Sequence, residues 1–471
     1  MKACYREVTV QETAQSPFLL YQETRRGRRT EKFVRRFFRI RSHCQGSKPD
    51  KGRKKEEIMK KRIFSALLAG MTALSMAACS SGGSADTAAS SESADTTETS
   101  EETASSGETI KLGTIAPKTG SLASFGIAAT NGANLAVKEI NEAGGIDGMQ
   151  IEVINTDDQS DPTECLNAFN SLVSDGVGLI VGSVTSGCTS AITGAANEEG
   201  VVLITPSATA DSITTEDDYV FRACYADSFQ GAIAAAYAAQ SGYTSVGVVY
   251  CAADTYSKGL YDSFSAACEK YGVSVDAVES TASMDVQDYT NQFASMVKAG
   301  VELVYCPYYY DVIGPYLVTQ ARAAGYDGII MGADGYDGSL DYTVDGADLT
   351  AFNNVYWTNH FDASDDSEIV QNFVKAYEDE YNESPICFAA LAYDCVYMYK
   401  DAIERAGSTD PSAVRDALAD TSVTYTCVTG TFSLDETGTP EKGASIIAFT
   451  SDGSTVSSEL VDVVTSLPDA E

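Results

Sequence analysis

Small hydroxyl residues stand directly after two apolar runs of the chain. The run 177–184 leads to Ser186, and the run 201–206 leads to Ser207 and Thr209. Both runs are rich in Val and Ile, as buried strands are, and parallel sheets bind ligands beyond the carboxyl ends of their strands. Where a helix begins there, free main-chain N–H groups and the helix dipole favour an anion. We expect Ser186, Ser207 and Thr209 to hold a carboxylate; the alternative is that Ser186 only caps a helix.

An acid occupies the matching place later in the chain. Asp334 follows the apolar run 328–333, which also reads as a strand leading into a turn. A carboxylate there can accept charge-assisted hydrogen bonds from an ammonium group. Groups that bind a carboxylate on one side of a cleft and an ammonium on the other would together bind an α-amino acid. No Arg is expected at a strand end, which favours neutral zwitterions over dicarboxylates. The alternative for Asp334 is a turn residue before Gly335.

The elements that must position these residues alternate along the chain. From about residue 109, short apolar runs bounded by Gly, Pro or Asp alternate with segments of helical length. A repeated strand–helix–strand order predicts right-handed crossovers and a parallel sheet covered on both faces. The pattern restarts near residue 245, and a body of roughly 360 residues exceeds what one hydrophobic core usually serves. We therefore expect an α/β fold of two doubly wound, Rossmann-like lobes.

Several ordered motifs carry a family resemblance. They are GxxxPxTG from Gly113, INxAGGIxG at 140–148, DDxxDP at 157–162, VGSVTSGCT at 181–189, ITPSAT at 204–209 and IMGADG at 330–335. In this order the chain resembles the type I periplasmic-type solute-binding proteins of the branched-chain amino acid transport group. The resemblance implies three crossover strands, near 222–226, 356–359 and 426–431. It divides the body into lobe one, 109–225 plus 357–426, and lobe two, 226–356 plus 427–471.

The same resemblance implies a function and a pocket. The chain would be a monomeric, extracytoplasmic substrate-binding protein of an ABC importer that closes about a hinge on an amino acid, branched-chain or otherwise apolar, and hands it to permease subunits. Ser186 and Thr209 fall where the family binds the carboxylate. Asp334 stands where the family has Glu, which shortens that arm by one methylene. The aromatic wall would come from these residues: Phe125, Tyr256, Tyr309 and Phe388.

Two alternatives to this function stay open. The same clamp could report its ligand state to a signalling receptor, or it could bind a small carboxylate or amide without an amino group. An enzyme is not expected, because the mature region has a single histidine, His360, and lacks a nucleophile elbow and the glycine-rich phosphate loops. No cofactor and no metal site is expected, since closely paired Cys ligands are missing.

The N-terminal part of the chain predicts export. Residues 59–78 combine a basic head with a short apolar stretch and precede Cys79, as in a bacterial lipoprotein signal. Residues 79–108 are Ser-, Thr- and acid-rich and read as a disordered tether. Residues 1–58 read as a start assigned too far upstream or as a disordered basic extension. We expect a lipid anchor at Cys79 on the outer face of the cell membrane of a bacterium, Gram-positive by type.

Charge and cysteines complete the sequence picture. The net charge of −35 argues against nucleic acid or an anionic bilayer as a direct partner, so membrane contact is expected through the anchor alone. Relatives often carry a disulfide at the positions that are Ser160 and Thr185 here. Cys165 and Cys188 lie a few residues further along the same segments and are expected as a substitute pair; buried free thiols are the alternative.

Overall fold

The computed structural model describes residues 109–214, 219–343 and 346–468. All of them belong to one compact unit, residues 101–471. The predicted start region 1–58, the signal 59–78, the lipidated Cys79 and the tether 79–108 lie outside the described residues. No helix in the described part is long and apolar enough to cross a membrane.

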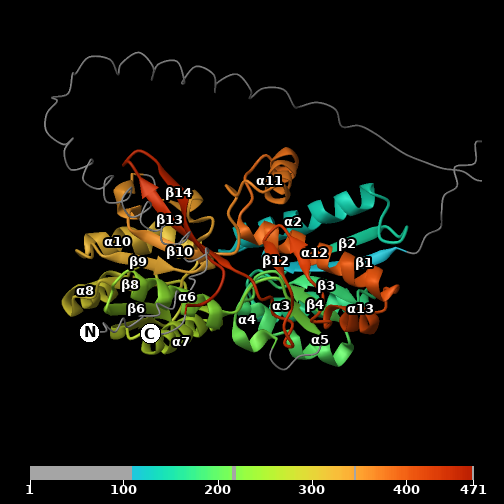
Figure 1. Cartoon of the computed structure of the whole chain (residues 1–471), viewed down its shortest axis with the longest axis horizontal. Coiled ribbons are helices and arrows are strands. Elements are labelled where there is room, and N and C mark those ends of the chain that lie inside the picture. Colours follow the sequence, from blue (N-terminus) through green and yellow to red (C-terminus); the bar gives the residue numbers. More distant parts are fainter. Residues whose placement is uncertain (1–108, 215–218, 344–345, 469–471) are drawn as a thin grey trace, which may run out of the picture. The chain divides into compact units, whose positions relative to one another are not determined.

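The first sheet has five parallel strands in the order β2-β1-β3-β4-β5. Its strands are β1 (Ile110–Ala116), β2 (Ile151–Asp157), β3 (Leu179–Gly182), β4 (Val202–Thr205) and β5 (Val220–Arg222). The helices between them are α2 (Ala123–Glu142), α3 (Pro162–Ser174), α4 (Ser186–Ser190) and α5 (Thr193–Glu199). Three later helices, α11 (Glu368–Tyr381), α12 (Cys387–Ala406) and α13 (Pro411–Leu418), contact elements of this lobe, and α12 lies along α2 (Figure 1).

The second sheet has seven strands in the order β14-β13-β10-β9-β8-β6-β7. Its parallel part consists of β6 (Ser245–Cys251), β7 (Ser274–Thr281), β8 (Leu303–Tyr305), β9 (Ile329–Gly332) and β10 (Val355–Asn359). Two antiparallel strands, β13 (Ala444–Ser451) and β14 (Val456–Val464), extend it beyond β10. Its main helices are α6 (Asp227–Gln240), α7 (Thr255–Lys270), α8 (Thr290–Ala299), α9 (Tyr310–Val312) and α10 (Val318–Ala323).

The chain passes between the two sheets three times. It leaves the first sheet after β5, returns after β10, and crosses again after a small hairpin of β11 (Tyr425–Cys427) and β12 (Gly430–Phe432). The fold predicted from the sequence, two doubly wound α/β lobes with three connections, is confirmed. The chain positions of the crossings differ slightly from expectation, because β10 itself is a member of the second sheet.

Local signals explain where several elements begin and end. The Asp161 side chain accepts hydrogen bonds from the main-chain N–H groups of Thr163 and Glu164, at 2.7 and 3.1 Å, and Pro162 follows it as the first residue of α3. A carboxylate at this position satisfies N–H groups that have no partner within the helix. Gly200 ends α5 with a φ of 66°, the left-handed conformation that favours glycine.

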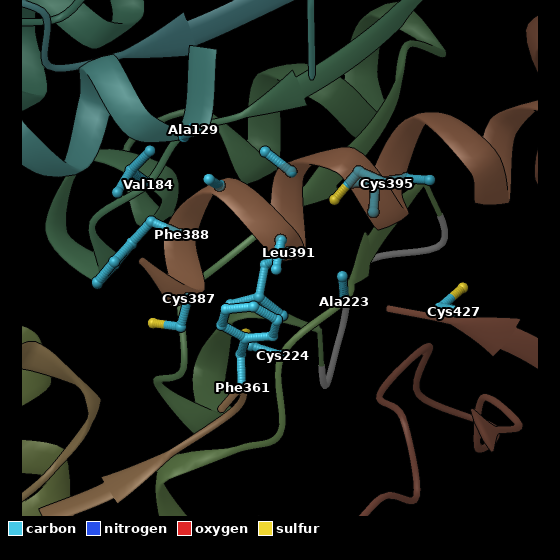
Figure 2. Close-up of a cluster of buried hydrophobic side chains, with 14 of the residues drawn as sticks. Ala129, Val184, Ala223, Cys224, Phe361, Cys387, Phe388, Leu391, Cys395 and Cys427 are labelled. Carbon is cyan, nitrogen blue, oxygen red and sulfur yellow. The ribbon is translucent and has the colours of Figure 1, made fainter. Parts of the chain in front are cut away.

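A buried cluster lies where the three connections meet. Figure 2 shows side chains from the first connection (Ala223, Cys224), from the second (Phe361) and from β11 ahead of the third (Cys427), and all four residues are buried. Their neighbours on α12 are Cys387, Phe388, Leu391 and Cys395. The small thiol and methyl groups here allow the connections to lie close to α12, so the core of the first lobe extends beneath the hinge region.

Candidate functional site

A narrow cavity lies between the two lobes, and residues from both line it. Its free volume is about 10 Å³, the space of roughly one water molecule, so a larger ligand fits only when the lobes move apart. Seven of the eight residues proposed from the sequence line it: Phe125, Ser186, Ser207, Tyr256, Tyr309, Asp334 and Phe388. The other lining residues are Val184, Thr185 and Gly335. The structure thus brings together residues that stand more than 260 positions apart in the chain.

The hydroxyl side of the cavity belongs to the first lobe. Ser186 is the first residue of α4, and its Oγ accepts a hydrogen bond from the Ala210 N–H at 3.2 Å. Ser207 Oγ donates to the Val184 carbonyl at 2.8 Å. The helix cap is Thr185, whose hydroxyl accepts from the Cys188 N–H, so Ser186 is not the cap residue. Ser186 therefore keeps its own O–H available as a donor, since its recorded bond uses the oxygen as an acceptor.

Thr209, the third hydroxyl residue proposed for the carboxylate, is not among the residues that line the cavity. The residue is fully buried. Arg222 explains its position, because its guanidinium donates to the Thr209 and Ala210 carbonyls at 3.0 and 3.1 Å. The expectation that no Arg stands at a strand end was wrong, since Arg222 ends β5. The Arg222 guanidinium binds the carbonyls of the loop 208–210 and does not line the cavity. Among the described residues, those that line the cavity include no Lys, Arg or His.

The acid side of the cavity belongs to the second lobe. Asp334 follows β9 and is 2% exposed. Its Oδ1 accepts hydrogen bonds from the Tyr256 hydroxyl and from Gln230 Nε2, both at 2.9 Å. Its Oδ2 lies 3.4 Å from His360 Nε2. A carboxylate has about four acceptor positions, so Oδ2 retains capacity for a further donor.

His360 lies beneath Asp334 and stacks on Tyr225, with ring centroids 3.7 Å apart. Burial lowers the pKa of His360 to about 4, while the neighbouring Asp334 acts in the opposite direction. The imidazole is therefore neutral at pH 7 and gives Asp334 no positive partner. The sequence analysis assigned no role to His360, and it did not single out Gln230. Nothing in the spacing of either residue marks it as a neighbour of Asp334.

Aromatic rings form a continuous wall across the two lobes. Phe125 and Phe388 stack at 3.8 Å, and Tyr256 and Tyr309 stack at 4.9 Å. Phe125 meets Tyr309 edge to face at 6.1 Å, which joins the pair of the first lobe to the pair of the second. Offset stacks and edge-to-face contacts are the favoured arrangements of aromatic pairs. The wall leaves an apolar surface between the hydroxyl side and the acid side.

Direct contacts between the lobes close the cavity. The Tyr310 hydroxyl donates to the Ser121 carbonyl at 2.7 Å and accepts from the Ser124 N–H at 3.1 Å. Asp337 Oδ2 accepts from the Cys387 N–H at 2.7 Å. Burial raises the pKa of Asp337, although the hydrogen bond from the Cys387 N–H opposes the rise. The residues that line the cavity are correspondingly shielded from solvent.

A larger hollow of about 490 Å³ lies elsewhere in the second lobe, between α10 and the segment 348–354. Its one arginine, Arg322, already donates to four main-chain carbonyls, those of Tyr326, Gly328, Ala351 and Asn353. No sequence-derived candidate lies there. The small cavity between the lobes is therefore the better candidate site, despite its smaller volume.

The predicted cysteine pair lies close together beneath the hydroxyl side. Cys165 of α3 and Cys188 of α4 are both buried free thiols. Their sulfur atoms and a carboxylate oxygen of Asp158 all lie within 4.8 Å of one another. The carboxylate accepts hydrogen bonds from the Ser183 hydroxyl and the Ser160 N–H. This hydrogen bonding accounts for the buried acid without a metal ion.

Comparison with known proteins identifies the family. The model of the periplasmic binding protein family matches residues 109–454. The chain belongs to this family. It is 33% identical over 331 residues to Leu/Ile/Val-binding protein homolog 3 of Brucella melitensis, covering 70% of this chain and 88% of that protein. It is 32% identical to the leucine-, isoleucine-, valine-, threonine-, and alanine-binding protein of Pseudomonas aeruginosa, covering 70% and 87%.

Solved structures agree with this assignment. LivJ from Streptococcus pneumoniae, a branched-chain amino acid transporter substrate-binding protein in complex with isoleucine, superposes with a TM-score of 0.68 at 35% identity, covering 75% of this chain and 99% of LivJ. The leucine-binding protein LivK from Thermotoga maritima gives a TM-score of 0.68 at 27% identity, covering 76% and 99%. The chain described here is thus a substrate-binding protein, and its family works outside the cytoplasm.

Proposed function

We propose that this chain captures an apolar α-amino acid, of the size of leucine, isoleucine or valine, and delivers it to the permease of an ABC importer. The observation that carries the proposal is one closed cavity with donors for a carboxylate on one lobe and a buried acid on the other. Ser186 would donate its O–H to the carboxylate, and Ser207 would do so after its O–H turns away from the Val184 carbonyl. Asp334 would bind the ammonium group. The names of the relatives, which concern leucine, isoleucine and valine, support the same ligand class.

The four rings proposed from the sequence would contact the ligand side chain. Phe125, Tyr256, Tyr309 and Phe388 leave little room, which favours aliphatic over aromatic side chains. Ligand would enter only after the lobes part, since the cavity is closed in this structure. Docking on the first lobe followed by rotation about the three connections is the hinge motion that such an architecture permits. We also propose that Cys79 carries a lipid that anchors the protein to the outer face of the membrane.

Isothermal titration calorimetry with leucine, isoleucine, valine, phenylalanine, alanine and glycine tests the proposal. We expect the three branched amino acids to bind most tightly, and glycine to bind weakly because it fills none of the aromatic wall. A protein that binds none of them, but binds a small molecule without an amino group, would contradict the proposed ligand class.

Replacing Ser186 by Ala tests the carboxylate side. The change removes one hydrogen bond to a charged group, worth about 1.5–3 kcal/mol, so the Kd for leucine should rise by about 10- to 100-fold. Ser190→Ala is the matched control, because Ser190 ends the same helix and is exposed. Equal affinities of the Ser186→Ala variant and the wild type would remove Ser186 from the site.

We propose that Cys165 and Cys188 form a disulfide in the exported protein. The two thiols would pass two electrons and two protons to an oxidised thiol–disulfide partner before folding buries them. Alkylation under denaturing conditions should then label seven of the nine cysteines of the described region, nine less the two that pair. Reduction before alkylation should restore nine. Nine labelled cysteines without reduction would show that the pair stays as buried thiols.

A further inference from the structure

Asp334 is a buried carboxylate without a cationic partner from the protein. The only ion-pair neighbour that the described residues give it is His360, which is neutral at pH 7. Its other neighbours are the uncharged donors Tyr256 and Gln230. A buried carboxylate is costly unless it is hydrogen-bonded or paired. The arrangement around Asp334 therefore lacks one component, a positive charge, and the open position for it is on Oδ2.

Gln230 holds Asp334 through two separate atoms. Its Nε2 donates to Asp334 Oδ1 at 2.9 Å, and its Oε1 accepts from the Asp334 main-chain N–H at 3.1 Å. The two bonds together fix both the main chain and the side chain of the acid. Gln230 is fully buried on α6, in the segment that follows the first connection between the lobes.

Thr358 fixes the orientation of the Gln230 amide. The Thr358 hydroxyl, on β10, donates to Gln230 Oε1 at 2.7 Å. Oε1 accepts from three donors, the third being the Tyr225 hydroxyl at 3.5 Å, so the amide cannot turn over without breaking all three bonds. Its N–H group must therefore point to Asp334. The Tyr256 hydroxyl donates to the same oxygen, so Oδ1 is occupied twice and Oδ2 is the oxygen that remains for a ligand.

His360 completes the arrangement on the other side. Its ring lies flat on Tyr225 and is 4% exposed, with Nε2 3.4 Å from Oδ2. Neither ring nitrogen has a hydrogen bond of ordinary geometry in the described part of the chain. The imidazole is not among the residues that line the cavity. It therefore limits the positions that Oδ2 can take without competing for the ligand at close range.

We infer that Gln230, oriented by Thr358 and assisted by His360, is a positioning residue that directs Asp334 Oδ2 at the ligand and makes an amino group a requirement for tight binding. The inference rests on the proposed function. Its physical basis is preorganisation: an acid already held in place loses little freedom when the ligand arrives. The shorter arm of Asp334 makes such support more important, because the carboxylate cannot reach toward a displaced ammonium group.

The test compares leucine with 4-methylpentanoate, which is leucine without its amino group. In Gln230→Met, which conserves volume, the Kd for leucine should rise by about 10- to 100-fold, since a hydrogen bond to a charged group is lost. The Kd for 4-methylpentanoate, measured by displacement calorimetry, should change by less than about threefold, so the preference for the amino group falls. Thr358→Val should act in the same direction with a smaller effect.

Gln320→Met is the control, because the Gln320 amide also makes two hydrogen bonds away from the cavity: Oε1 accepts from the Tyr289 N–H in a half-buried bond, and Nε2 donates to the Gln287 carbonyl in an exposed one. It should leave the preference unchanged. The inference is overturned if Gln230→Met raises the Kd of leucine and of 4-methylpentanoate by the same factor. It is also overturned if Gln230→Met keeps the wild-type preference for leucine over 4-methylpentanoate while Asp334→Asn abolishes that preference. In both cases the proposed function stands. If the wild type shows no preference for leucine over 4-methylpentanoate, both fail. If Gln230→Met does not fold, Thr358→Val decides alone by the same ratio.

Discussion

Replacing Asp334 by Asn should nearly abolish the binding of leucine. The change keeps the shape of the side chain and removes the one negative charge on the cavity wall among the described residues. Loss of one partner from a buried, hydrogen-bonded charge pair costs about 2–5 kcal/mol, so the Kd should rise by roughly 30-fold to several thousand-fold. Calorimetry of the variant and the wild type under the same conditions measures the effect directly.

Two further measurements separate a binding effect from a folding effect. Without ligand, Asp334→Asn should melt no earlier than the wild type, because it removes a buried charge that no protein cation pairs with. With leucine, the wild type alone should gain thermal stability. Asp327→Asn is the control, since Asp327 is exposed beside the other end of β9. Unchanged leucine affinity in Asp334→Asn would remove the acid from the proposed mechanism.

Replacing Gly132 by Ala should destabilise the whole first lobe. A Cβ at Gly132 would lie 2.0 Å from the Ala389 carbonyl oxygen, so α2 and α12 could not keep their present distance. Overpacking typically costs 1–3 kcal/mol, and a clash between main-chain atoms of two long helices should fall at about the upper end of that range. Urea unfolding measures the change in the free energy of unfolding.

The same substitution should weaken binding, because α2 carries Phe125 and α12 carries Phe388, whose rings stack on the cavity wall. Gly194→Ala on α5 is the matched control, since a Cβ there meets nothing within 4 Å. It should be neutral or stabilising by up to about 1 kcal/mol, as expected for an exposed helical glycine. Equal stabilities of the two variants would show that α2 and α12 can separate without cost.

The site residues that could be predicted from the sequence are those that stand directly after a short apolar strand. Ser186, Ser207 and Asp334 all follow short apolar strands, and the ends of parallel strands meet at one edge of a sheet. The structure brings these three to one cavity, and it confirms the α/β fold. Strand β14 was not predicted, because its side chains are mostly exposed and give no alternating apolar pattern.

Residues whose role depends on packing were not found. Gln230 reaches Asp334 because α6 lies beside β10 and the turn that follows β9, and no spacing in the sequence reveals these neighbours. Thr209, proposed from the sequence as a carboxylate ligand, is not among the residues that line the cavity, and Arg222 donates to its carbonyl. A side chain that follows a strand can face the cavity or the core. The choice between them is made by neighbours distant in sequence.

A crystal structure of the protein with leucine would show how the ligand lies between the two lobes. We expect electron density for one leucine between Phe125 and Tyr309, with its carboxylate within hydrogen-bond distance of Ser186 and Ser207 and its ammonium within that distance of Asp334 Oδ2. Leucine bound outside this cavity, or bound with its ammonium group away from Asp334, would contradict this expectation.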